Sequence, residues 1–326
     1  MEILNSTLRD LFTRYGGAEG DAFSSPWPVT RKAQPMSNPM MYKIRVLGPT
    51  ATVRHALTDP EAMRVWLAEH VEVDLPNRYE FWGRYTPEGD TARQRLLHVD
   101  DQVLRFSWQL SGKDSIVEIG LEQETPESTV LTLTQTEVPG FEEMVRETST
   151  LALMHTYWAL AFANLADYVE GREITAKCDF TDPVQRQEVL IDAPTQEVFD
   201  ALTNPDKFAR WFGANVGIEP KVGGRFAMGG FEMKHHPAEI TVFEPGRAMT
   251  IAWPDMVAGW ELEGSGGKTR FTVVQSGFDE QNPPYGAWMG WLSGIAELRL
   301  FLERPDWRPR PVAMHVDGMP EGLLNI

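Results

Sequence analysis

One stretch of sequence occurs twice and decides the fold. Residues 49–60 read PTATVRHALTDP, residues 194–205 read PTQEVFDALTNP, and a tryptophan follows each copy at the same distance, Trp66 and Trp211. Every matching pair in the two stretches is separated by 145 positions. Because self-similarity at a fixed separation marks a duplicated structural unit, the sequence predicts two copies of one domain in tandem.

The repeat continues far beyond this stretch. The pattern Leu104-x-Phe106-x-Trp108 matches Met249-x-Ile251-x-Trp253 at the same separation of 145 positions. Further along the chain the separation shrinks, to 140 between Gln135 and Gln275 and to 133 between Trp158 and Trp291. The register therefore survives across loops, and the second copy has the shorter ones.

Each copy has the same predicted order of elements. In the second copy a short strand, Glu188–Ile191, precedes two short helices that begin near Thr195 and Pro205. Runs of alternating apolar and polar residues then predict an antiparallel meander, over Arg225–Met228, Ala238–Phe243, Ala248–Trp253, Val257–Glu263 and Thr269–Gln275. Apolar residues at three- and four-residue spacing from Trp288 to Leu302 predict one closing helix. In the first copy a strand is expected near Tyr79–Tyr85, and the corresponding closing helix is expected over about Met144–Glu170.

The predicted fold class is α+β, with two tandem domains that each wrap a curved antiparallel sheet around a long C-terminal helix. The expected division is an N-terminal extension (1–41), a first domain (42–172), a linker (173–184), a second domain (185–304) and a C-terminal tail (305–326). Because each copy has its own strands and helix, we expect the second copy to fold alone. Nothing in the sequence of the two ends demands that they pack across the domains.

Composition and charge limit the possible partners. The length of 326 residues suits two domains, and the formal net charge of -17 argues against a nucleic-acid partner. Charged residues interrupt the first fifteen positions, so no signal peptide is expected there, and no stretch resembles a membrane span. We therefore expect a cytoplasmic protein. The single cysteine, Cys178, excludes an intramolecular disulfide and a zinc site built of several thiolates.

The second copy resembles the SRPBCC superfamily (START, Bet v 1-like, polyketide cyclase), and within it the family of activators of heat shock protein 90 ATPase homologues. The resemblance covers about Glu188 to Glu303. It rests on several short motifs in order, which are Ile191-Asp192-Ala193-Pro194, Val222-Gly223-Gly224-Arg225-Phe226, Glu244-Pro245-Gly246-Arg247, Gln275-Ser276-Gly277-Phe278 and the helix from Trp288. The first copy joins the family through the repeat and lacks the Gly-Gly-Arg turn. The resemblance implies a helix-grip fold, with an elongated cavity between sheet and helix that binds apolar molecules in relatives.

Alternation along the strands selects candidate ligand-binding residues on the inner faces of the sheets. A pocket lined by large apolar groups with a few polar anchors is typical of small-molecule sites. The candidates are Tyr79, Phe81, Trp108, Gln135 and Trp158 in the first copy, and Phe226, Met228, Ile251, Trp253, Gln275, Trp288 and Trp291 in the second. The alternative is that these side chains simply fill a core. Gln135 and Gln275 are the most informative, because an inward amide needs either a structural partner or a ligand.

The sequence gives little support for catalysis. His235 and His236 are neighbours without a third ligand at useful spacing, so a metal site is not expected, and no cofactor motif occurs. His155 could face the cavity as an acid or base, or pack on the helix. The expected function is binding of a small hydrophobic or aromatic molecule; the alternative is an enzyme of cyclase or hydratase type. A chaperone ATPase co-regulator is less expected, because the extension before Tyr42 is too short for the separate chaperone-binding domain that such activators carry.

Overall fold

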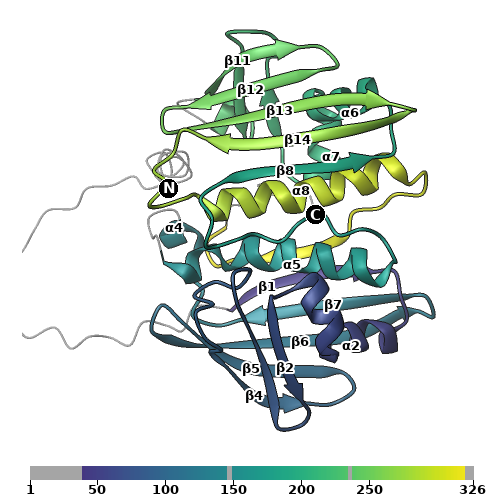
Figure 1. The fold of residues 1–326 in the computed structure, drawn as a ribbon, viewed down its shortest axis with the longest axis vertical. Coiled ribbons are helices and arrows are strands. Elements are labelled where there is room, and N and C mark those ends of the chain that lie inside the picture. The colour runs from purple at the N-terminus through teal and green to yellow at the C-terminus, as the bar shows by residue number, and fades with distance from the viewer. Residues whose placement is uncertain (1–38, 145–148, 234–236, 320–326) are drawn as a thin grey trace, which may run out of the picture.

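The computed structural model describes residues 39–144, 149–233 and 237–319. Two antiparallel sheets form the outer parts of the molecule, and two long helices, α5 and α8, lie side by side between them (Figure 1). We call the part built on the first sheet domain one and the part built on the second domain two. The predicted α+β class and the tandem helix-grip architecture are confirmed.

Domain one contains a six-stranded sheet in the order β15-β1-β7-β6-β5-β4 and a separate two-stranded sheet, β2-β3. Its elements in chain order are β1 (Met40–Val46), α2 (Thr50–Thr58), α3 (Pro60–Trp66), β2 (His70–Asp74), β3 (Arg78–Trp82), β4 (Gln94–Val99), β5 (Val103–Leu110), β6 (Lys113–Thr125), β7 (Ser128–Gln135), α4 (Phe141–Met144), the 3₁₀ turn η1 (Thr150–Leu153) and α5 (Met154–Val169).

Domain two contains a seven-stranded sheet in the order β8-β14-β13-β12-β11-β10-β9. Its elements are β8 (Gln185–Ile191), α6 (Thr195–Thr203), α7 (Pro205–Phe212), β9 (Val216–Ile218), β10 (Arg225–Met228), the 3₁₀ turn η2 (Phe231–Met233), β11 (Ala238–Glu244), β12 (Ala248–Trp253), β13 (Met256–Ser265), β14 (Lys268–Ser276) and α8 (Tyr285–Glu303). The last strand, β15 (Pro311–His315), follows α8 and belongs to the sheet of domain one.

The repeated stretch forms the same pair of short helices in both domains. In each pair the second helix begins at a proline, which suits the first turn because that position needs no backbone donor. The indole N–H of Trp66 donates to the carbonyl of Ala56 at 2.9 Å, and that of Trp211 donates to Ala201 at 2.9 Å. The repeated tryptophan therefore ties the second helix to the first by the same hydrogen bond in both copies.

Three details differ from the sequence prediction. The short strands β2 and β9 were not predicted. The closing helix of domain one is α5, Met154–Val169, so a continuous helix from Met144 is wrong. The backbone of Ser149 is extended, which stops a helix from running through this position; residues 145–148 lie outside the described part of the chain. Tyr79–Tyr85 was predicted as one strand, but β3 ends at Trp82.

Helices α5 and α8 pack in the same direction along the boundary between the domains. A Cβ at Gly286, in the first turn of α8, would lie 3.6 Å from Cβ of Leu153, just before α5. At the other end, Arg172 donates to Glu303 at 2.8 Å. Both helices are buried on most sides, because each covers its own sheet and also contacts the other helix. Each closing helix therefore buries part of its surface against the other domain, and independent folding of the second copy stays a prediction.

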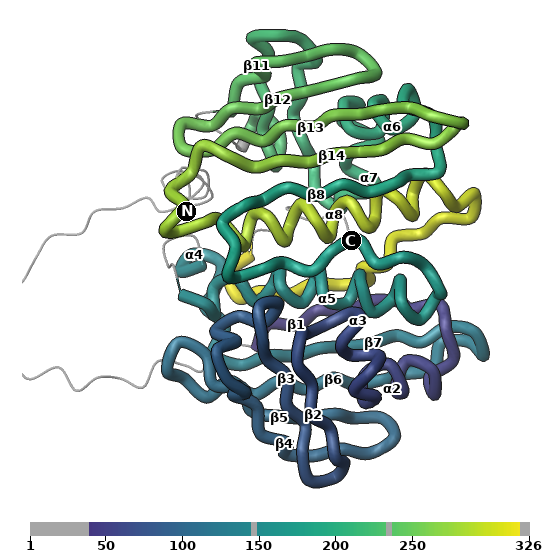
Figure 2. Tube along the Cα trace, in the orientation of Figure 1, coloured from purple at the N-terminus to yellow at the C-terminus, as the bar shows by residue number. Residues whose placement is uncertain are grey.

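The C-terminal tail crosses back to domain one. Strand β15 pairs antiparallel with β1, with Met41 opposite His315 and Lys43 opposite Ala313. Figure 2 shows this yellow segment running beside the purple strand β1. The residues that end the chain therefore add a strand to the sheet that begins it, which no pattern in the tail predicted.

A buried charge cluster holds the tail between the helices. Arg310, only 4% exposed, donates through Nη2 to Asp167 at 2.6 Å and to Glu170 at 3.0 Å, both on or next to α5. The carboxylate of Glu297 on α8 accepts from the backbone N–H of Arg310 at 3.5 Å. Burial raises the pKa of Glu297 to about 7, against a smaller opposing effect of Arg310. This cluster connects α5, α8 and the tail at one point.

Among the described helices, none is both long and apolar enough to cross a bilayer.

Candidate functional site

The predicted site residues lie on the inner faces of the two sheets and on the helices that face them. All five candidates of domain one are buried, namely Tyr79, Phe81, Trp108, Gln135 and Trp158. In domain two Phe226, Ile251, Gln275, Trp288 and Trp291 are buried, whereas Met228 and Trp253 are half-buried. The inward assignment by strand alternation thus agrees with the structure, and the two domains differ in how far their candidates are covered.

In domain one the candidates form a filled core. Phe81 contacts Trp108 edge to face at 5.0 Å, and Trp108 contacts Trp158 of α5 at 5.9 Å between ring centroids. Gln135 is bonded at both ends of its amide, because Trp158 Nε1 donates to Oε1 at 2.7 Å and Nε2 donates to Ser115 Oγ at 3.0 Å. Gln135 is therefore a structural amide that joins β7, β6 and α5.

In domain two the aromatic candidates meet around a residue that the sequence analysis did not list. Trp260 of β13 lies 5.3 Å from Trp291 of α8 and 6.3 Å from Phe226 of β10. Phe226 also contacts Trp253 at 6.0 Å. Trp260 was placed on a predicted strand, and its alternation with Ala258 and Leu262 could have identified it as inward.

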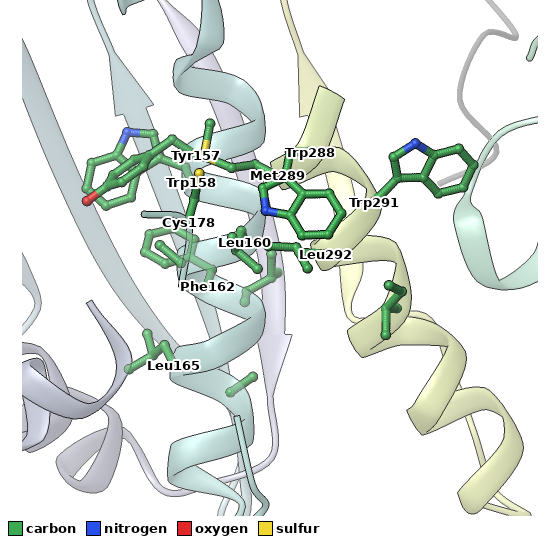
Figure 3. Packing of buried hydrophobic residues seen from close by; sticks show 14 of the residues in the cluster. Tyr157, Trp158, Leu160, Phe162, Leu165, Cys178, Trp288, Met289, Trp291 and Leu292 are labelled. Atoms are coloured by element: carbon green, nitrogen blue, oxygen red, sulfur yellow. The ribbon is translucent and has the colours of Figure 1, made fainter. Parts of the chain in front are cut away.

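Helix α7 adds two further aromatic side chains to this cluster. Phe208 and Phe212 lie 6.5 Å and 5.6 Å from Trp291. Figure 3 shows Trp291 on the side of α8 away from α5, whereas Met289 points towards α5. The cluster therefore belongs to the interior of domain two. Sequence reasoning missed Phe208 and Phe212 as site residues because only the fold brings α7 against α8.

Gln275 corresponds to Gln135 but is bonded differently. Its Nε2 donates to the sulfur of Met256 at 2.9 Å, and thioether sulfur is a weak acceptor. Its Oε1 has no hydrogen-bond partner among the described residues, although the side chain is only 2% exposed. The same holds for the indole N–H of Trp260, also 2% exposed. Domain two thus has a buried acceptor and a buried donor on its inner face.

The half-buried candidates lie at one edge of this inner face. Met228 ends β10 and is followed by Gly229 and Gly230, both with positive φ, of 80° and 89°. Phe231 comes next, and the guanidinium of Arg225 lies 4.3 Å from the centroid of its ring. The two glycines allow a sharp turn that other residues would resist. His235 and His236, which were not expected to form a metal site, lie outside the described part of the chain.

The cavities at domain one are small. One of about 10 Å³ lies where the linker crosses α5, lined by Trp66, Leu67, Tyr85, Tyr157, Leu160, Ala161, Asn164, Lys177, Cys178 and Met289. Another of about 10 Å³ lies between α2 and strands β5 and β6. A volume of this size admits about one water molecule. Neither cavity lies between a sheet and its closing helix, where the resemblance implied an elongated cavity.

The ionisable candidates show no arrangement for acid–base chemistry. Burial lowers the pKa of His155 to about 4, so this ring is neutral near pH 7. It lies on α5 in domain one, in the opposite domain from the Trp260 cluster. Within the residues described here, no group of three His, Cys, Asp or Glu side chains is arranged to hold a metal ion. The structure thus favours packing as the role of His155.

The fold and the inner faces define a tandem pair of helix-grip domains, and comparison with known families places the chain among them. A model of the family described as activator of Hsp90 ATPase homolog 1-like protein matches residues 48–170 and 192–303. The two matched regions together span more than half of the chain. The protein therefore belongs to this family, as the resemblance indicated, and both copies are members.

Among solved structures, the chain is similar to CalU16 from Micromonospora echinospora, at 28% identity over 38% of this chain and 76% of that one, with a TM-score of 0.32. It is also similar to DynU16, a putative protein of the dynemicin biosynthetic locus, at 15% identity over 80% and 98% of the two chains, with a TM-score of 0.36. A third, the di-domain ARO/CYC BexL from the BE-7585A biosynthetic pathway, is 16% identical over 83% and 99%, with a TM-score of 0.33. No curated protein matches the chain.

Proposed function

We propose that domain two binds a small, mainly apolar molecule that contains a ring, between the inner face of strands β10–β14 and helix α8. The observation that carries this proposal is a difference in side-chain exposure between corresponding positions of the two domains. Strand β3 pairs with β2 in the same register as β10 pairs with β9. Tyr79 and Phe226 therefore occupy corresponding positions, and so do Phe81 and Met228. Phe81 is fully buried in domain one, whereas Met228 is half-buried in domain two.

The aromatic cluster supplies the surface for such a molecule. Rings of Phe226, Trp253, Trp260 and Trp291 are arranged edge to face or nearly so, and a flat ligand can continue this pattern. A mostly apolar lining with few polar groups is the usual construction of a small-molecule site. The alternative, an enzyme acting on such a molecule, needs an acid and a base at this cluster, and no observation favours it.

Thermal unfolding of the full chain with a series of naphthalenes tests the proposal. A ligand that binds only the folded protein raises its melting temperature, because binding removes population from the unfolded state. Met228→Trp narrows the entry and should abolish the shift. The matched control is Val242→Trp, which adds the same indole at a side chain of β11 that is 36% exposed and should leave the shift unchanged. An unchanged melting temperature across the series, or an equal shift in Met228→Trp, would contradict the proposal.

A further inference from the structure

Several polar atoms on the inner face of domain two are buried and lack a hydrogen-bond partner among the described residues. They include the amide oxygen of Gln275, an acceptor, the indole nitrogen of Trp260, a donor, and both amide atoms of Gln185, which lies opposite Gln275 on β8. Buried polar groups in folded proteins are almost always bonded, and each exception calls for an explanation. The acceptor of Gln275 and the donor of Trp260 point to a ligand that supplies both missing partners.

The register of the sheet brings the two atoms to the same face. Strand β13 pairs with β14 so that Ala258 lies opposite Gln275 and Trp260 lies opposite Val273. Gln275 and Trp260 are therefore diagonal neighbours on one face, with their Cα atoms roughly 7–8 Å apart. Ala258, opposite Gln275, contributes only a methyl group. The acceptor and the donor thus lie on one face beside a small residue, and they make no hydrogen bond to each other.

Neighbouring side chains hold both groups in place. The bond from Gln275 Nε2 to Met256 Sδ fixes which end of the amide is used, and leaves Oε1 as the free end. The indole of Trp260 lies between Phe226 and Trp291, with ring planes inclined by 82° and 75° to it. A group positioned by packing can select a ligand, because little side-chain freedom is lost on binding.

Domain one does not have this pair. At the corresponding positions of its sheet, Gln135 is bonded at both ends and Ile119 replaces Trp260. Domain one does contain buried polar groups without a described partner, which include the indole N–H of Trp108, the amide nitrogen of Gln94 opposite it and the hydroxyl of Tyr157, but no amide oxygen is among them. A buried amide oxygen without a described partner therefore distinguishes domain two.

We infer that Gln275 and Trp260 determine the specificity of the ligand site, and that they select a ring molecule with one hydrogen-bond donor and one separate acceptor. The ligand's hydroxyl or amine donates to Gln275 Oε1, and its carbonyl accepts from Trp260 Nε1. This inference rests on the proposed binding function and deepens it. It adds a chemical requirement to a site whose remaining lining is apolar.

Equilibrium dialysis of the full chain against four matched probes tests the inference. The probes are naphthalene, 2-naphthol with a donor, 2-acetylnaphthalene with an acceptor, and 6-acetyl-2-naphthol with both. Each satisfied group should tighten binding about fivefold, which corresponds to the usual net effect of one hydrogen bond. The molecule with both groups should therefore bind roughly 25-fold more tightly than naphthalene.

Single substitutions separate the two roles. Gln275→Leu should remove the advantage of the hydroxyl and keep that of the acetyl group, whereas Trp260→Phe should do the reverse. The matched control, Trp108→Phe, removes a buried indole N–H in domain one and should leave every ratio unchanged. If either substitution changes both ratios or neither, the assignment of roles is wrong.

The probe series on the unsubstituted chain separates the roles of Gln275 and Trp260 from the proposed binding function. If the four probes bind equally well, the specificity pair is overturned while the proposed binding function stands. If none of them binds, the proposed function itself fails. This experiment uses only the unsubstituted chain, so it tests the inference even if Trp260→Phe is unstable.

Discussion

The two domains place a glutamine at the same position of the same fold and use it differently. In domain one, Gln135 accepts from Trp158 on the closing helix and donates to Ser115 on the neighbouring strand. In domain two, Gln275 has only the sulfur of Met256 as a described partner. The difference teaches that the fold determines where the amide lies, and that its neighbours decide whether both of its ends are hydrogen-bonded.

The sheets differ at their edges as well. Strand β1 of domain one is covered by β15, a strand that follows domain two in the chain. The corresponding strand of domain two, β8, is the edge of its sheet. Domain one is thus completed by a segment from beyond domain two, which makes it the more dependent partner in a chain of two similar halves.

The largest effect that we expect comes from the cluster that holds this segment. Arg310→Leu leaves the buried carboxylate of Glu170 without its cation and Asp167 with Arg172 alone, and should lower the free energy of unfolding by about 3–5 kcal/mol. Hydrogen exchange should also accelerate at Arg45, whose backbone N–H donates to the carbonyl of Arg310 at 2.8 Å. The exposed Arg308 provides the control, because Arg308→Leu should change stability by less than about 0.5 kcal/mol. Equal effects of the two substitutions in urea denaturation would show that the cluster does not hold the tail.

The glutamine comparison is tested by the same substitution in each domain. Gln135→Leu removes two hydrogen bonds and leaves a buried indole N–H unpaired, so it should lower the free energy of unfolding by about 3 kcal/mol. Gln275→Leu removes an amide that is only weakly bonded and should change it by less than about 1 kcal/mol. Urea denaturation of both variants measures the difference. A loss of similar size at both positions would mean that Gln275 has a structural partner equivalent to that of Gln135.

The free energy of unfolding should depend on pH through Glu297, which lies at the boundary between the domains. Its pKa is raised from 4.5 to about 7, because burial disfavours the charged form, so the folded state retains the proton longer than the unfolded state. The stability that this group contributes is fully present below about pH 4.5 and is lost as pH rises through 7. We expect a decline of roughly 2 kcal/mol across this window relative to Glu297→Gln, which cannot lose a proton.

The difference between the wild-type and Glu297→Gln pH profiles is the quantity to measure, because all other titrating groups cancel to first order. The charged groups facing Glu297 are Arg310, Asp167 and Glu170, and both proteins contain all three. A flat difference between pH 4.5 and 8 would show that Glu297 has the same pKa in the folded and unfolded protein.

The smallest effect that we expect is a difference in stability between alanine substitutions on the two sides of α8. A Cβ at Gly294 would lie 2.8 Å from the ring of Phe212 within domain two, so Gly294→Ala should lower stability by about 1 kcal/mol through overpacking. A Cβ at Gly286 would meet Leu153 of domain one at an ordinary 3.6 Å, so Gly286→Ala should be neutral or stabilise by up to about 1 kcal/mol through helix propensity. Melting temperatures measured side by side give the comparison. The opposite order would place the tighter contact between the domains instead of within domain two.

Several features of the fold could be predicted from the sequence because they depend on local patterns. The repeat predicted two similar domains, since Trp66 and Trp211 make the same hydrogen bond in each. Alternation assigned the inward residues correctly, because successive side chains of a strand point to opposite faces. The closing helix of domain one was predicted too long, because its start depends on the extended backbone at Ser149 and not on apolar spacing.

By itself, the sequence determined the two copies, their strand order and the inward position of Gln135 and Gln275, all of which follow from periodicity. Only the tertiary structure decided that β15 joins the first sheet and that α5 packs on α8. It also decided that the amide oxygen of Gln275 lacks the partner that Gln135 has. The physical reason is that these outcomes depend on contacts between residues far apart in the chain, and identical local patterns in the two copies acquire different neighbours when the chain folds.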